Sequence, residues 1–153
     1  MAKRDNQLRY LLYRSLTREG LRLPLAAAFG LYGAAARLFS RGKVPSIRTV
    51  EREVLAYVRD GLTPGRNCWT SLFVPTEILY AFDLAPLSLE GLAALCASMG
   101  IAEDFLGRHG THFVPNTMCS FHRLALDLGQ SGVLPRPRLV VASSALCDGN
   151  GKT

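Results

Sequence analysis

Closely spaced pairs of cysteines are absent from this chain of 153 residues. Its four cysteines, Cys68, Cys96, Cys119 and Cys147, stand far apart, whereas a structural zinc site takes its ligands from short paired motifs. The sequence therefore excludes an ordinary zinc finger. It also lacks the charged-then-apolar opening of a secretory signal. We expect a cytoplasmic protein whose thiols stay reduced and open to burial or metal binding.

Long apolar runs are also missing. The most apolar stretch, residues 23–36, is interrupted by Pro24, Gly30 and Gly33 and is shorter than the ~20 residues that span a bilayer. We therefore expect no transmembrane segment. With 48% hydrophobic residues, the chain can nevertheless build one core of ordinary domain size.

Acidic residues are scarce in the first part of the chain. Residues 1–66 hold thirteen Lys and Arg against five Asp and Glu, and residues 67–153 hold five against seven. A basic arm suits nucleic acid, anionic lipid, an acidic partner or the phosphates of coenzyme A, but solvated helix faces explain it as well. No aromatic-interleaved RNA motif or recognition-helix pattern is present, so we expect no nucleic-acid partner.

The apolar periodicity divides the chain in two. It predicts three helices in the basic part, over residues 3–22, 25–39 and 46–59. Ser46 is the predicted cap of the third helix. The breaker cluster at residues 61–65 follows. We therefore expect a helical basic arm over residues 1–62 and a partial α/β domain over residues 63–153.

The second part alternates between short apolar segments and helical ones. Strands are predicted over residues 67–73, 85–87 and 139–142, and helices start near Pro75, run from Ser88 to Met99, and continue from Cys119 to a stop at Gly129. This alternation predicts an α/β fold with a parallel, Rossmann-like sheet. Ligands of such sheets bind beyond the carboxyl ends of the strands, where residues 143–148 would lie.

Two cysteines have the surroundings of site residues. Cys119 stands at a predicted helix N-terminus, where backbone N–H groups and the dipole favour thiolate, and Cys147 follows a strand with Gly149 close behind. By itself a lone cysteine is more often a small buried hydrophobe. We assign that packing role to Cys68 and Cys96.

Three segments together resemble a known family. Residues 74–81 with residues 84–87, then residues 116–120, then the run Cys147, Asp148 and Gly149 followed by Lys152, resemble the opening domain of 2-hydroxyacyl-CoA dehydratase subunits and the related benzoyl-CoA reductase subunits. The resemblance covers about residues 65–152. The basic arm before it carries no motif that we can assign.

The resemblance implies one four-iron four-sulfur (4Fe-4S) cluster held through three cysteines. Cys119 and Cys147 match the first two ligands, and Ser120, Asp148 and Gly149 would flank the cluster. The third ligand of the family lies in a second α/β domain that this chain lacks, so the ligand set is incomplete and we expect no activity from the chain alone. At the matching helix start, Glu77 would be an acid–base residue near the substrate; the alternative is a first-turn carboxylate favoured by the helix dipole.

The implied enzyme works in anaerobic cytoplasm with a second dehydratase subunit. It takes one electron from an ATP-dependent iron–sulfur activator and passes it through the cluster to an acyl-CoA thioester for radical dehydration. A benzoyl-CoA reductase-like subunit is the first alternative. The second is a truncated remnant or interaction module that binds no cluster. His109, His112 and His122 lack partners at ligand spacing, so we interpret them as surface or loop residues rather than a metal set.

Overall fold

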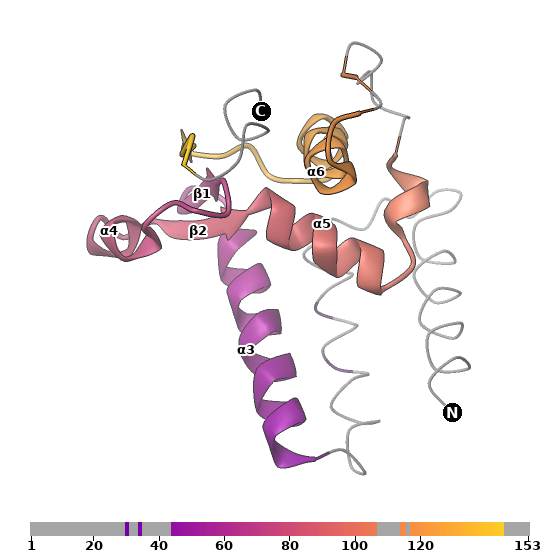
Figure 1. Ribbon diagram of the computed structural model, residues 1–153. Coiled ribbons are helices and arrows are strands. Elements are labelled where there is room, and N and C mark those ends of the chain that lie inside the picture. Colours follow the sequence, from indigo (N-terminus) through magenta and orange to yellow (C-terminus); the bar gives the residue numbers. More distant parts are fainter. Residues whose placement is uncertain (1–29, 31–33, 35–43, 107–113, 116, 146–153) are drawn as a thin grey trace.

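Helices and strands alternate along the described part of the chain. The computed structural model describes residues 30, 34, 44–106, 114–115 and 117–145. The helices predicted over residues 3–22 and 25–39 lie outside these residues, apart from Gly30 and Ala34, which are helical. The elements in chain order (Figure 1) are α3 (Pro45–Gly61), β1 (Asn67–Thr70), α4 (Thr76–Ala81), β2 (Ala85–Ser88), α5 (Leu89–Ser98), η2 (Ala102–Asp104), α6 (Ser120–Gln130) and β3 (Leu139–Val141).

The three strands form one parallel sheet in the order β2-β1-β3. β1 is central, because Trp69 is paired with Leu87 of β2 on one side and with Val140 of β3 on the other. The chain leaves β1 for β2 through α4 and later returns to the opposite side of β1. The predicted parallel α/β fold of Rossmann-like type is confirmed. β1 and β3 are shorter than predicted, and β2 extends one residue further, to Ser88.

Helices cover both faces of the sheet. Figure 1 shows α4 on one side of the strands and α5 with α6 on the other. The alternating directions of the β1 side chains explain this arrangement: Cys68 packs in a small cluster with Leu79 of α4, whereas Trp69 packs against the main core.

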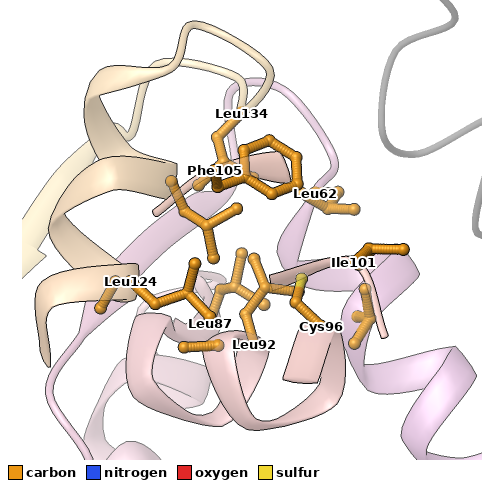
Figure 2. Close-up of a cluster of buried hydrophobic side chains, with 12 residues drawn as sticks. Leu62, Leu87, Leu92, Cys96, Ile101, Phe105, Leu124 and Leu134 are labelled. Atoms are coloured by element: carbon orange, nitrogen blue, oxygen red, sulfur yellow. The ribbon is translucent and has the colours of Figure 1, made fainter. Parts of the chain in front are cut away.

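The main core lies between α3, β2, α5 and α6. Its twelve buried residues are Val58, Leu62, Leu87, Leu92, Ala93, Cys96, Ile101, Phe105, Leu124, Ala125, Leu128 and Leu134. Figure 2 shows the apolar side chains of this cluster packed together. The end of α3 thus belongs to this core through Val58 and Leu62. The division of the chain after residue 62 stays a prediction.

Two helix boundaries differ from the prediction. The cap predicted for α3, Ser46, is wrong. The helix begins at Pro45 with Val44 at the cap position, because proline's fixed φ suits the first turn, and Ser46 falls inside the helix. The stop of α6 is also wrong: the helix passes through Gly129 and ends at Gln130. Gly129 packs against the Trp69 ring, since a Cβ built there would stand 3.4 Å from Cζ3. By contrast, Ser88 caps α5 as predicted, its hydroxyl accepting from the Gly91 N–H at 3.1 Å.

One buried side chain fixes where β3 joins the sheet. Asn67, the first residue of β1, donates through Nδ2 to the carbonyl oxygens of Pro135 and Arg136, both at 3.1 Å. Its own carbonyl accepts from the Arg138 N–H at 2.9 Å. These bonds hold the segment entering β3 beside the start of β1. No helix in the described ranges is long and apolar enough to cross a membrane.

Candidate functional site

The strand order places the candidate site at the carboxyl edge of the sheet. β2 and β3 lie on opposite sides of β1, so the direction of the strand order reverses at β1. In open parallel sheets this switch point is where ligands bind. The last residue of β1, Thr70, is 3% exposed, and its hydroxyl has no hydrogen-bond partner within the described residues. The Thr70 hydroxyl is therefore a buried polar group at the carboxyl end of β1 that could bond to a ligand.

Cys119 stands at the cap position of α6 with its thiol exposed. The pKa of this thiol is lowered, first by hydrogen bonding with the His122 side chain and then by the backbone N–H groups of Phe121 and His122. Those N–H groups belong to the second and third helical residues, which a side chain at the cap position faces. The thiolate that binds metal is therefore favoured at this position, as predicted from the helix start.

His122 is not a surface residue, so that prediction is wrong. It is 7% exposed and faces α5, where its Nε2 lies 3.7 Å from Oε1 of Glu90. Glu90 is itself buried, and its Oε2 lies 3.3 Å from the Ser88 hydroxyl. The error arose because helical spacing does not reveal which face a second helix covers. The interval of three residues between Cys119 and His122 was the available signal, since it places both on one face at a helix start.

These contacts locate Cys119 relative to the strands. Ser88 is the last residue of β2 and pairs with Thr70 at the end of β1. From Ser88, the contacts run through Glu90 in the first turn of α5 to His122 in the first turn of α6, beside Cys119. The N-terminus of α6 is therefore on the carboxyl side of the sheet.

The connection after β3 leaves from the same edge. The Ser71 N–H donates to the carbonyl of Val141 at 3.2 Å, and the Ser71 hydroxyl accepts from the Ser143 N–H at 2.9 Å. The segments that follow β1 and β3 are thus bonded to each other. Cys147, Asp148 and Gly149 lie a few residues further on, outside the described residues.

The other predicted site residues on described segments are exposed. Ser120 is the first residue of α6, next to Cys119. Glu77 lies in the first turn of α4, a helix that packs on the opposite face of the sheet from α6 (Figure 1). No contact in the structure joins Glu77 to Cys119, and the roles of Glu77 and Ser120 stay predictions.

Cys68 and Cys96 are buried packing residues, as predicted. Both have 0% exposure. Figure 2 shows the Cys96 sulfur among apolar side chains next to Leu92 and Ile101, and this burial raises the pKa of its thiol to about 12. Burial also raises the pKa of Cys68. Both thiols are therefore held in the form that does not bind metal.

The donor set is compatible with a metal cluster only in part. Cys119 has the exposure and thiolate character of a ligand, and the segment after β3 leads from the same edge toward Cys147. Over the described ranges, however, no group of three or more His, Cys, Asp or Glu side chains could hold a metal ion. His109 and His112 lie outside those ranges.

Comparison with known proteins identifies a family. The sequence model of the family described as 2-hydroxyglutaryl-CoA dehydratase, D-component, matches residues 71–153. This match covers more than half of the 153-residue chain and includes both candidate ligand cysteines. No curated protein and no solved structure matches the chain.

Proposed function

This chain belongs to the 2-hydroxyglutaryl-CoA dehydratase D-component family, and we propose that it is an iron–sulfur subunit, or a piece of one, of a 2-hydroxyacyl-CoA dehydratase. Cys119 and Cys147 would each bind one iron of a 4Fe-4S cluster. Ser120, Asp148 and Gly149 would flank it. The observation that carries the proposal is the exposed Cys119 thiol with its lowered pKa, at the sheet edge from which the chain also leads to Cys147.

The chain's own residues would prepare the cysteine rather than carry out the chemistry. The N-terminus of α6 and His122 favour the thiolate at Cys119, and a thiolate is the form that ligates iron. The bond between Ser71 and Ser143 fixes where the segment after β3 leaves the sheet. When bound, the cluster would supply a one-electron reduction of an acyl-CoA thioester. Glu77 is proposed as an acid–base residue on α4, the helix on the other face of the sheet.

The proposal implies partners. These are an acyl-CoA substrate, an ATP-dependent iron–sulfur activator as electron source, and a second dehydratase subunit. We assign the third cluster ligand to a residue outside this sequence, because the two remaining cysteines, Cys68 and Cys96, are both buried in the core.

Iron and acid-labile sulfide, measured on protein purified and reconstituted without oxygen, test the proposal. We expect bound iron and sulfide with visible charge-transfer absorption. The double variant Cys119→Ala with Cys147→Ala should lose them with unchanged far-ultraviolet circular dichroism. Cys96→Ala is the matched control, since it removes a buried thiol and should keep its iron.

Two results would count against an iron–sulfur role. One is iron bound equally by the parent and the double variant, which would mean adventitious metal. The other is a folded parent chain that takes up no iron or sulfide. That result would favour the remnant or interaction module, because within the described residues no complete metal-binding group is present.

A further inference from the structure

The two edges of the sheet differ in how they are covered. β2 forms one edge, and its four residues are all buried. α3 packs against this strand, and the Tyr57 hydroxyl of α3 accepts the Ser88 N–H at 2.7 Å. β3 forms the other edge, where it pairs with β1 alone among the described strands and where none of its residues is buried. Native proteins commonly cover sheet edges, because unpaired backbone groups there can pair with another chain.

β3 has the side chains of an interior strand. Leu139 is 44% exposed and Val140 is 61% exposed. They point to opposite faces of the sheet, because Leu139 is paired with Cys68 on the α4 side and Val140 with Trp69 on the side of the main core. Strands of parallel sheets are normally covered on both faces, and apolar residues on both faces are typical of such covered strands. β3 therefore presents apolar side chains on two faces beside an open backbone edge.

The free backbone groups of this edge belong to Val140. The Val141 carbonyl accepts the Ser71 N–H at 3.2 Å, so residue 141 is directed toward β1. Successive residues of a strand direct their N–H and C=O groups to alternate sides, and those of Val140 consequently point to the open edge. An antiparallel strand centred on the same residue could exchange two hydrogen bonds with Val140.

The charges beside β3 favour an antiparallel second copy as the partner strand. Arg136 and Arg138 precede the strand, whereas residues 139–145 carry no charge. In two antiparallel copies centred on Val140, Arg138 of each copy would lie opposite Ala142 of the other, and Arg136 opposite Ser144. Parallel copies in the same register would instead place each arginine opposite its own equivalent, and like charges directly opposite are destabilising.

We propose that β3 is a self-association surface, to which a second copy of this chain adds its own β3 across a two-fold axis. The axis would pass between the two Val140 residues, and the sheets of both copies would form one continuous sheet. Such an interface uses the same surface on both copies and closes at two. Because a single strand pair is small compared with the ~1,200–2,000 Å² of stable specific interfaces, we expect a reversible dimer that depends on protein concentration.

The first experiment measures the mass of the full chain by light scattering after size exclusion, over a series of protein concentrations. The mass of the parent should rise from that of a monomer toward that of a dimer. Val140→Lys places a charge at the open edge and should keep the protein monomeric. Val50→Lys is the matched control: Val50 is 62% exposed, almost the same as Val140, but lies on α3. This control should dimerise as the parent does.

The second experiment stays informative if a lysine at position 140 prevents folding. Val140→Cys is introduced together with Cys119→Ala and Cys147→Ala, and the protein is oxidised. In the proposed dimer the two introduced cysteines would face each other with Cα atoms about 5.5 Å apart, a separation that a disulfide can bridge. Non-reducing gel electrophoresis should show a linked dimer. Val50→Cys in the same background should remain largely monomeric.

Three results would overturn the proposal. The first is a parent chain that stays monomeric over the whole concentration series. The second is a dimer that Val140→Lys leaves intact, since another surface would then join the copies. The third is equal cross-linking of Val140→Cys and Val50→Cys, which would indicate random collision. Neither experiment involves iron, so this inference and the proposed iron–sulfur function can fail separately.

Discussion

Replacing Gly61 by alanine tests whether α3 is part of the α/β unit or an independent helix beside it. Gly61 is the last residue of α3 and is buried against β2. A Cβ at this position would stand 2.8 Å from Cβ of Leu87 and 3.2 Å from the carbonyl oxygen of Pro86. Both atoms are part of, or attached directly to, the backbone of β2, so neither can turn away as the end of a long side chain could.

Two effects of opposite sign decide the outcome. In a helix alanine is favoured over glycine by about 1 kcal/mol. Overfilling a packed contact typically costs about 1–3 kcal/mol. The 2.8 Å approach to Cβ of Leu87 leaves no room for a methyl group, so the cost should lie in the upper part of that range, about 2–3 kcal/mol. After subtraction of the helix gain, we expect Gly61→Ala to lower the free energy of unfolding by about 1–2 kcal/mol, or Tm by about 2–8 °C for a chain of this size.

Urea and thermal unfolding followed by circular dichroism measure the change. Gly129→Ala is the matched control, because it also lies within a helix but its Cβ would stand 3.4 Å from the edge of the Trp69 ring, close to an ordinary contact. It should be neutral or mildly stabilising. A Gly61→Ala protein as stable as the parent, or more stable, would refute the packing of α3 against β2 and favour a separate arm.

Two further predictions concern the core and the cysteines. Leu92 is 1% exposed and lies in the main core. Leu92→Ala should lower the free energy of unfolding in urea by about 2–5 kcal/mol, because it leaves a cavity. Ala94→Gly, on the exposed side of the same helix, is the control and should lower it by about 1 kcal/mol. Among Cys68, Cys96 and Cys119, only Cys119 should be alkylated in the native state. Because the pKa of the Cys119 thiol is lowered, its alkylation rate should reach half of the maximum at a lower pH than the rate of a free thiol. A half-maximum at or above the free-thiol pH would contradict the proposed thiolate character.

Local signals in the sequence predicted most of the elements but not their contacts. Ser88 as a cap and the strand at Leu139 could be recognised because caps, turns and apolar runs act over a few neighbouring residues. The position of β3 beside β1 depends on Asn67 bonding to the carbonyls of Pro135 and Arg136, far along the chain. No local pattern contains that information.

The candidate site shows the same limit. Cys119 was selected because it stands at a predicted helix start and matches a ligand position in the family it resembles, and its thiol is exposed. The burial of Glu90 and His122 was not predicted, because the two residues lie on separate helices and acquire their environment only when α5 and α6 pack together. Burial, rather than residue type, is what distinguishes this histidine from a surface one.

The family match and the structural unit do not begin at the same residue. The match starts at Ser71, directly after β1, yet β1 is the central strand that pairs with both neighbours. Without β1, β2 and β3 would have no common partner, and Ser71 could not be held at the Val141 carbonyl. The carboxyl edge that carries the candidate site therefore depends on residues before the match, including Asn67, which positions β3, and the end of α3, which packs against β2. The site therefore depends structurally on residues from α3 onward, although the sequence features that indicate its function begin only after β1.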